Sequence, residues 1–311
     1  MSRFSATTLD LSRFPAPLAI RGIDYEEIRS SRIVRLKELL TGANIPFDVE
    51  QLETTPAAVL QETDAYRELL AYAAVNDAVK AGLVAFAVGA DLDHLGLTAA
   101  LGLPSGQRDS MLRRVIVPAS DSTPAVMESD AEYRRRLLLA PEAYATAGTA
   151  GGYLFHALWA DARVLNADVW CPSPGNVVVA VQSREGTGIA ASDLIQTVRT
   201  HLSRSDIKPL TDVVTVRSVV NVPYSVSLDA YVLPGPDQTA VGEAIRSAVA
   251  KTAAARRTPA RDMPRSAIIA AAQLDAVDKI ILASPMSDIA SGYGEVPVID
   301  GLEVRVHTYD G

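Results

Sequence analysis

The chain has 311 residues, of which 48% are hydrophobic, and a formal net charge of −8 at pH 7. A chain of this length exceeds what one hydrophobic core serves well, so two or three domains are expected. The acidic balance argues against nucleic acid as a partner, because phosphate contacts need clustered positive charge. No apolar run approaches the ~18 residues of a membrane helix, so a membrane partner is not expected either.

The first 90 residues are expected to form an N-terminal arm followed by helices. Two prolines make residues 1–22 an irregular arm. Asp24, followed three residues later by Glu27, is typical of a helix start, and this helix is expected to end at Gly42.

A long second helix is the main candidate for contact with a partner. Thr55 and Pro56 form a favourable helix start, and residues 57–88 contain no proline. The apolar row in this helix recurs near a 3.5-residue period: Leu69, Tyr72, Val79, Leu83 and Phe86. Such a row predicts either an inter-chain helical bundle or packing on the chain's own first helix.

Residues 91–123 are expected to be a short linking region with one helix and one strand. Three potential metal ligands lie close together at its start: Asp91, Asp93 and His94. No further ligand has the spacing of a known loop site, so Asp91 is better interpreted as the N-cap of a helix that ends at Gly102. Residues 112–117 predict a short strand, and residues 118–123 a polar linker.

Residues 124–212 predict a central α+β domain. Ser129 and Glu132 form a capping box, which predicts a helix that ends near Pro141. A second helix is expected after the glycines of residues 148–152, with Thr149 or Thr146 as its cap. This glycine cluster lacks the strand, spacing and lysine of a phosphate-binding loop.

A β-hairpin is expected next in the central domain. Residues 164–170 and 176–182 are rich in strand-forming residues, and Ser173-Pro174-Gly175 between them is a strong turn signal. Two strands joined in this way should pair antiparallel. Ser192 is expected to cap the following helix.

The C-terminal residues 213–311 predict a second small α+β domain. Residues 213–220 and 224–232 are expected to be a meander or an offset pair of strands. Two helices, a strand at residues 277–283 and a last strand at residues 302–307 complete the expected order. The fold class is therefore α+β, with an N-terminal helical arm, a long helix and two or more small domains with mainly antiparallel sheets.

Few side chains suggest chemistry. The single cysteine, Cys171, is expected to be a small buried apolar residue. The four histidines are far apart in the sequence and are expected to be structural: His94, His156, His201 and His307. We therefore predict no catalytic, cofactor-binding or metal site and no cofactor.

A run of three arginines indicates a second candidate interface: Arg134, Arg135 and Arg136. A charge run on a helix is usually a solvated face. The sharper alternative is a salt-bridging surface for an acidic neighbour, since exposed charges steer assembly.

Three stretches of the central region carry a resemblance to a known family. They read TPAVMESDAEYRRR at residues 123–136, AGTAGGYLFHALWADARV at residues 147–164 and CPSPGNVVVAVQSREGTG at residues 171–188. They resemble the central region of the baseplate J-like family of contractile phage tails. Residues 89–96 resemble the same family, so separate matches occur in the right order.

The resemblance implies a structural baseplate wedge protein, of the kind found in P2-like phages, R-type bacteriocins and related injection machines. In that family, copies pair within each wedge, join a partner wedge protein through N-terminal helices, and form a ring around the tail tube through C-terminal domains. The implied partners are thus further copies of this chain and other baseplate wedge proteins. The implied location is the baseplate of a virion or tail particle assembled in the cytoplasm of the bacterial host.

The resemblance also implies where these contacts lie and what they do. It assigns the bundle contact to residues 57–88 and the ring contact to residues 213–290, while residues 291–311 do not match the expected tail. The implied function is assembly, with a baseplate rearrangement that triggers sheath contraction. The alternative is a tail-associated enzyme that degrades the cell envelope, for which no acid pair, metal set or triad is visible.

Overall fold

The structure is a computed structural model that describes residues 15, 17–46, 55–103, 108–109, 111–120, 122–144, 147–235 and 237–308. The chain divides into two compact units. We call Thr7–Gly102 the helical unit, and Leu103–Gly311 together with Met1–Ala6 the sheet unit. Across the described ranges there are eight α-helices and eight strands, which confirms the α+β class.

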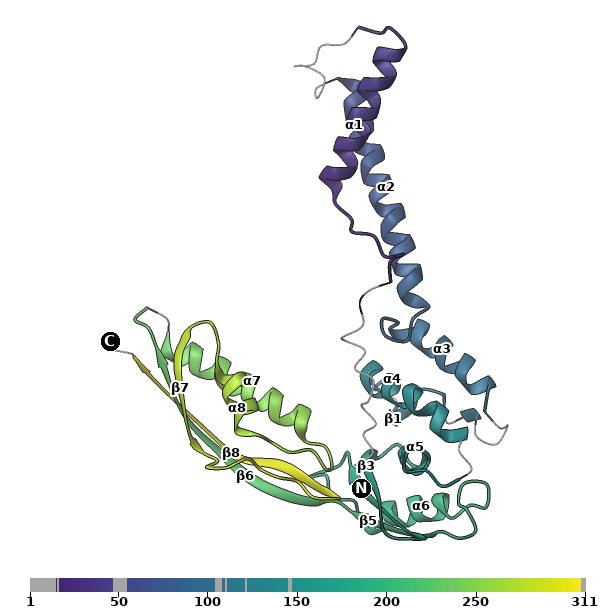
Figure 1. The fold of residues 1–311 in the computed structure, drawn as a ribbon, viewed down its shortest axis with the longest axis vertical. Helices are drawn as coiled ribbons and strands as arrows, with labels where there is room; N and C mark the ends of the chain where they lie inside the picture. Colours follow the sequence, from purple (N-terminus) through teal and green to yellow (C-terminus); the bar gives the residue numbers. More distant parts are fainter. Residues whose placement is uncertain are drawn as a thin grey trace. The chain divides into compact units, whose positions relative to one another are not determined.

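The helical unit contains a pair of neighbouring helices and a shorter third one (Figure 1). The three are α1 (Tyr25–Gly42), α2 (Pro56–Ala81) and α3 (Gly89–Leu101). Asp24 caps α1 by accepting hydrogen bonds from two backbone N–H groups of the first turn, as the sequence predicts. The expected arm of residues 1–22 lies mostly outside the described residues.

The long helix is shorter than predicted. It ends at Ala81 with Gly82 as its C-cap, and the chain then turns before α3. The N-cap of α3 is Val88, and Asp91 lies in the first turn, so the predicted cap is wrong although the predicted end at Gly102 is confirmed. Glycine at position 82 weakens helix propagation, which explains the early end.

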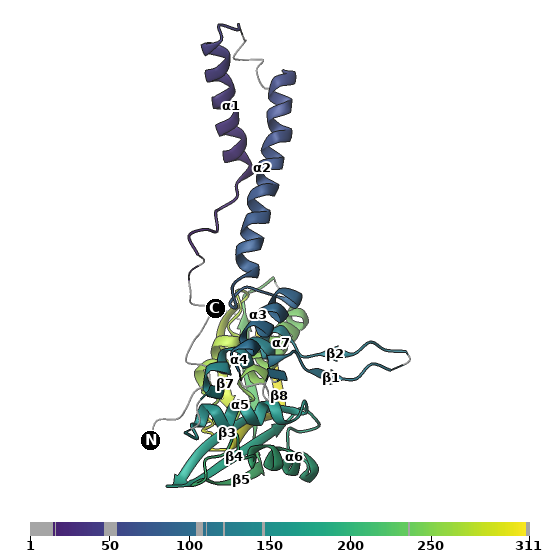
Figure 2. The same cartoon turned by 90° about the vertical axis from the view of Figure 1, so that its right-hand side faces the viewer.

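The sheet unit begins with a small antiparallel hairpin, β1 (Val115–Val117) and β2 (Val126–Met127). The hairpin projects from the rest of the unit (Figure 2). The strand at β1 is confirmed, but the return strand β2 is missing from the sequence-based prediction. Its two residues are too few to form a recognisable pattern.

The central lobe, residues 111–218, is built on a three-stranded sheet in the order β3-β4-β5. Its further elements are α4 (Asp130–Leu139), the 3-10 helix η4 (Ala140–Tyr144), α5 (Ala150–Ala160), β3 (Val164–Ser173), β4 (Asn176–Ser183), α6 (Ser192–Leu202) and β5 (Val213–Ser218). The predicted antiparallel β3–β4 hairpin is confirmed, with Gly175 at φ +76° in its turn. Ser129 and Thr149 cap α4 and α5 as predicted, whereas the cap of α6 is Ala191 rather than Ser192.

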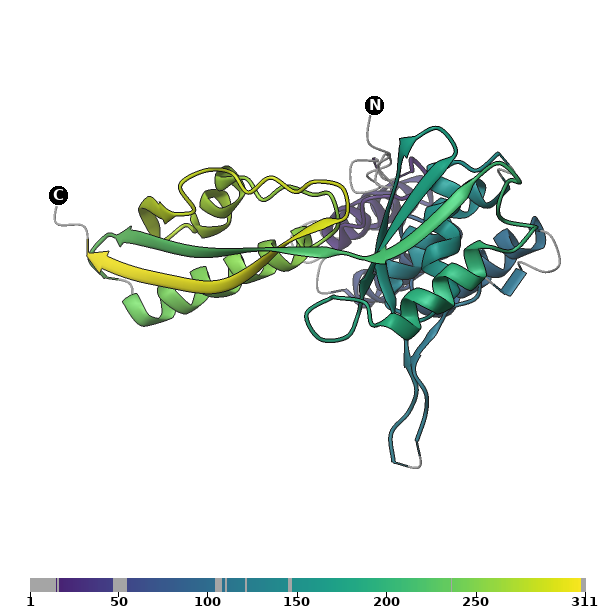
Figure 3. The ribbon, with the colours of Figure 1, turned by 90° about the horizontal axis from the view of Figure 1, so that it is seen from below.

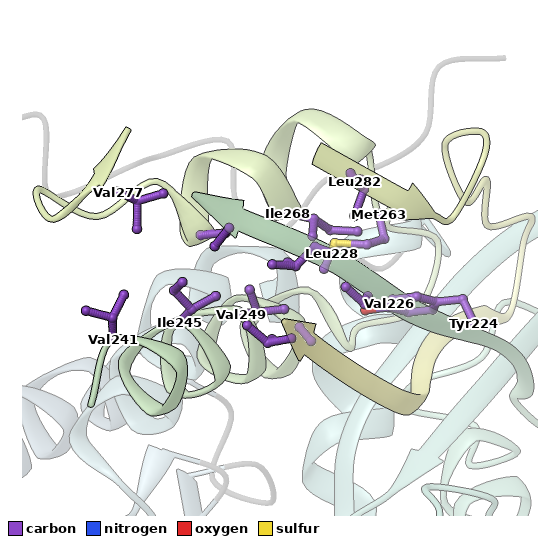
Figure 4. Close-up of a cluster of buried hydrophobic side chains, with 14 of the residues drawn as sticks. Tyr224, Val226, Leu228, Val241, Ile245, Val249, Met263, Ile268, Val277 and Leu282 are labelled. Carbon is purple, nitrogen blue, oxygen red and sulfur yellow. The ribbon is translucent and has the colours of Figure 1, made fainter. Parts of the chain in front are cut away.

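The C-terminal lobe, residues 220–308, is a second three-stranded sheet in the order β7-β6-β8. Its elements are β6 (Val220–Val232), α7 (Gln238–Arg256), α8 (Arg265–Ala272), β7 (Val277–Ser284) and β8 (Glu295–Thr308). The helices α7 and α8 bury the inner face of the sheet (Figure 4). Aliphatic side chains dominate this core, among them Leu228, Ile245 and Ile268, which are fully buried.

The expected pairing of residues 213–220 with residues 224–232 is wrong. β5 pairs in parallel with β4 in one sheet, and β6 lies between β7 and β8 in the other. The last strand also begins earlier than predicted, at Glu295, and runs parallel to β6. Local pattern identifies strands but cannot assign partners far apart in the sequence.

Candidate assembly surfaces

Ion pairs link the two neighbouring helices of the helical unit. The guanidinium of Arg32 on α1 reaches two carboxylates on α2, Glu68 at 2.6 Å and Asp64 at 3.2 Å. Arg29 contacts Glu62 at 3.0 Å. The hydrogen bond from Arg32, joined by one from Tyr72, holds the pKa of Glu68 below its usual value. Salt bridges that are partly exposed contribute little to stability.

Asn76 provides the buried polar contact of this unit. Its side chain exchanges two hydrogen bonds with the backbone of Arg21, at 2.9 and 3.1 Å. The Arg21 guanidinium lies 5.4 Å from the centre of the Tyr72 ring. A cavity of about 330 Å³ beside these residues is lined by Arg21, Tyr72 and the paired Arg32 and Glu68, among others.

The predicted apolar row lies on the inner side of α2. Leu69, Tyr72 and Val79 are half-buried on the side that carries the buried Asn76. Leu83 and Phe86, also half-buried, follow the end of the helix. This placement agrees with the alternative that the row packs within its own chain.

A different set of apolar residues on α2 is exposed. At 100° per residue they lie outside the stripe of α2 that carries the buried Ala58, Ala65 and Asn76. We call this set the outer face of α2: Val59, Leu60, Tyr66 and Leu70. These side chains are 48–64% exposed. The helix α1 has no buried residue at all, so the pair does not complete a core of its own.

The arginine run does not form the expected solvated face. Arg136 is 2% exposed, and its Nη2 lies 2.6 Å from a carboxylate oxygen of the fully buried Glu128. Arg114 contacts the same carboxylate at 2.9 Å. Arg135 is half-buried and donates to the amide oxygen of Asn166 at 2.9 Å. Arg136 is therefore a core residue, and the prediction of a solvated arginine face is wrong at this position.

The electrostatics of this cluster are those of a compensated buried charge. Burial alone would raise the pKa of Glu128, but the hydrogen bonds and positive charges of Arg136 and Arg114 outweigh it, so the pKa is lowered. Glu128 thus stays ionised inside the protein. The cluster closes the base of the β1–β2 hairpin, because Arg114 and Glu128 directly flank its strands.

Two histidines distant in sequence meet in the central lobe. His156 on α5 is 4% exposed, and its ring centre lies 6.0 Å from that of His201 on α6. Trp159 contacts the His201 ring edge to face at 4.8 Å. Burial lowers the pKa of both histidines to about 4, so both are neutral at pH 7. A cavity of about 430 Å³ adjoins His201.

The other residues considered for chemistry have structural surroundings. Among the residues that the structure describes, no group of three His, Cys, Asp or Glu side chains could hold a metal ion. Cys171 is exposed, which corrects the expected burial, and its thiol donates to the carbonyl of Ser173. A Cβ atom on Gly151 would lie 2.3 Å from Glu142, so this glycine permits close packing. Over the same ranges no helix is both long and apolar enough to span a membrane.

Comparison with known proteins gives matches in both units. The Baseplate J-like N-terminal domain matches residues 53–102, and the Baseplate J-like central domain matches residues 145–218. The first match ends where the helical unit ends, and the second ends where β5 ends. Baseplate protein J of Escherichia phage P2 is 38% identical over 296 residues, covering 90% of this chain and 92% of the phage protein. The resemblance is confirmed, and this chain belongs to the baseplate J-like family.

Proposed function

We propose that this chain is a structural wedge component of a contractile-tail baseplate. It assembles with copies of itself and with other wedge proteins into the ring around the tail tube, and takes part in the rearrangement that triggers sheath contraction. Its place is the baseplate of the tail particle, reached by assembly in the host cytoplasm. The relation to a phage baseplate protein over nearly the whole chain supports this role.

The outer face of α2 is the observation that carries the proposal. The helical unit presents apolar side chains on a helix pair that is linked by partly exposed ion pairs, so the unit gains from a further helix packed on it. We assign the contact between wedge components to this face. The half-buried row of Leu69, Tyr72 and Val79 then serves to position α2 rather than to meet the partner.

Co-expression tests the proposal. The full chain, produced with its neighbouring wedge proteins, is expected to elute as a complex, whose mass light scattering measures. A structure of the complex from electron microscopy is expected to show interfaces that bury more than about 1,000 Å² each. The double substitution Tyr66→Gln and Leu70→Gln is expected to abolish co-elution, because it removes apolar surface from the outer face.

A matched control uses the same helix. Arg67 is exposed beside these residues, and Arg67→Gln introduces the same side chain while leaving the apolar surface intact. It is expected to assemble like the wild type. A chain that stays monomeric with all its wedge neighbours at high concentration contradicts the proposed function. Normal assembly of the double variant contradicts only the assignment of the face.

A further inference from the structure

The two lobes of the sheet unit are covalently joined through a single residue. β5 ends at Ser218 and β6 begins at Val220, so Val219 alone joins the two strands. Figure 3 shows the chain running directly from one sheet into the other. Val219 is 3% exposed and packs with Ala180 and Val296 in a small core shared by both lobes. Because the connection is so short, the angle between the lobes depends on the side-chain and backbone contacts between them.

One set of contacts between the two lobes is aromatic. Trp170 of β3 and Tyr293, just before β8, have ring centres 5.5 Å apart and an interplanar angle of 18°. The guanidinium of Arg217 on β5 lies 4.9 Å from the Trp170 ring centre, in the geometry of a cation–π contact. We call these three residues the aromatic latch.

Gly294 holds the backbone next to Tyr293 in place against the central lobe. Its N–H donates to a carboxylate oxygen of Asp168 at 2.7 Å, and its carbonyl accepts from the N–H of Val220 at 2.9 Å. Its φ is +73°, and an added Cβ would lie 2.9 Å from the Cβ of Ala180. Only glycine combines this backbone conformation with so close an approach to the central sheet.

A second set of contacts between the two lobes is polar. Arg257, at the end of α7, donates through its guanidinium to the carbonyl of Thr187 in the central lobe. Asn221 donates to the same carbonyl at 3.1 Å, and Gln182 donates to the carbonyl of Arg257 at 3.1 Å. We call the contacts of Arg257 with Thr187 and Gln182 the polar latch.

We propose that the two latches form a conformational lock that sets the angle between the lobes, and that opening them lets the C-terminal lobe pivot at Val219. Both latches consist of a few side chains and backbone groups, and Tyr293 is 39% exposed. The main aliphatic core of the C-terminal lobe lies within that lobe and stays intact when the latches open. The lock therefore offers two arrangements of the lobes without unfolding either one.

Distance measurement between spin labels tests the lock in the full chain. Labels are placed at Gln196→Cys on α6 and Ala250→Cys on α7 in a Cys171→Ser background. The inter-lobe distance distribution is expected to be narrow with intact latches. In the variant that combines Tyr293→Ala with Arg257→Ala, its width is expected at least to double.

Two controls separate unlocking from unfolding. A label pair inside the C-terminal lobe, Ala250→Cys with Asp278→Cys, is expected to stay narrow in every variant. Tyr293→Phe keeps the stacked ring and is expected to retain the narrow inter-lobe distribution. The proposal is overturned if the inter-lobe distribution is already broad in the latched protein, or if it stays narrow when both latches are removed. It is also overturned if the pair inside the lobe broadens equally.

Discussion

Single residues show why a run of like charges need not form a charged face. Successive residues of an α-helix are about 100° apart, so three adjacent arginines point in three directions. One of them, Arg136, therefore points into the protein and meets Glu128 there. The sequence gives no sign of this pairing, because Glu128 precedes the helix and looks like an ordinary surface acid. Only the folded chain brings Glu128 and Arg136 together.

Removal of the buried acid is the first prediction. Glu128→Gln is expected to lower the free energy of unfolding of the sheet unit by about 3–5 kcal/mol, because Arg136 and Arg114 lose their counter-charge. Urea unfolding followed by tryptophan fluorescence measures this, since Trp159 and Trp170 both lie in the sheet unit.

An exposed pair provides the comparison for this substitution. Glu243 contacts Arg246 one turn away on α7, and its side chain is 68% exposed. Glu243→Gln is expected to change the free energy of unfolding by less than about 1 kcal/mol. Equal effects of the two substitutions would show that the cluster at Glu128 does not behave as a buried pair.

The histidine pair predicts a pH dependence. His156 and His201 have pKa values lowered by burial from 6.5 to about 4, and the charged groups that act on them are Arg204 and Asp206. Below pH 6.5 the unfolded chain binds protons that the folded chain does not, so stability falls as the pH drops from about 6.5 to about 4. Urea midpoints measured across this range test the slope.

Substitution of the pair identifies its share of that slope. His156→Gln combined with His201→Gln is expected to flatten the dependence between pH 4 and 6.5, whatever its effect on stability at pH 7. His94→Gln, in the exposed part of α3 in the other unit, is expected to leave the slope unchanged. An unchanged slope in the double variant would rule out the pair as its source.

Elements divide into those that local chemistry determines and those that it does not. The caps Asp24, Ser129 and Thr149 start helices where the sequence predicts, because a side chain next to free N–H groups is enough. The partners of β5 and β6 depend on residues far along the chain, so the sequence identifies these strands but not their sheets. The outer face of α2 was missed for a related reason. Val59, Tyr66 and Leu70 recur at the helical spacing that core residues also show, and only the folded chain shows that they are exposed.

The early end of α2 predicts opposite effects for two glycines. Gly82 has φ −80°, and an added Cβ would make only an ordinary contact, 3.7 Å from the carbonyl oxygen of Val79, so Gly82→Ala is expected to stabilise the end of α2 by about 0.5–1 kcal/mol. Gly89 has φ +54°, so Gly89→Ala is expected to destabilise the start of α3 by about 1 kcal/mol. Hydrogen exchange of the amides in both helices measures the effects, and changes of the same sign would contradict this account.

The whole chain combines two units with very different interiors. Among its described residues, the helical unit buries small side chains of α2 and, on α3, Leu92 and Ala100, whereas α1 has no buried residue. The sheet unit holds a continuous aliphatic cluster around β6. Because burial of apolar surface dominates stability, the two units are expected to differ in their resistance to denaturant.

The difference between the units predicts two separate unfolding transitions for the free chain. Far-UV circular dichroism reports on helices in both units, whereas tryptophan fluorescence reports on the sheet unit alone. Helical signal is expected to be lost at lower urea than fluorescence changes. Coincident transitions would show that the units unfold as one.

The parallel pairing of β6 with β8 has a consequence for the order of events during synthesis. Val220 pairs with Glu295 and Val232 with Thr308, so the central strand leaves the ribosome well before its neighbour exists. The helices α7 and α8 emerge in the interval and can already cover the apolar face of β6, but its edge stays open. That edge closes only after β8 has been translated. Until then the exposed edge of β6 can pair with a strand of another chain synthesised nearby.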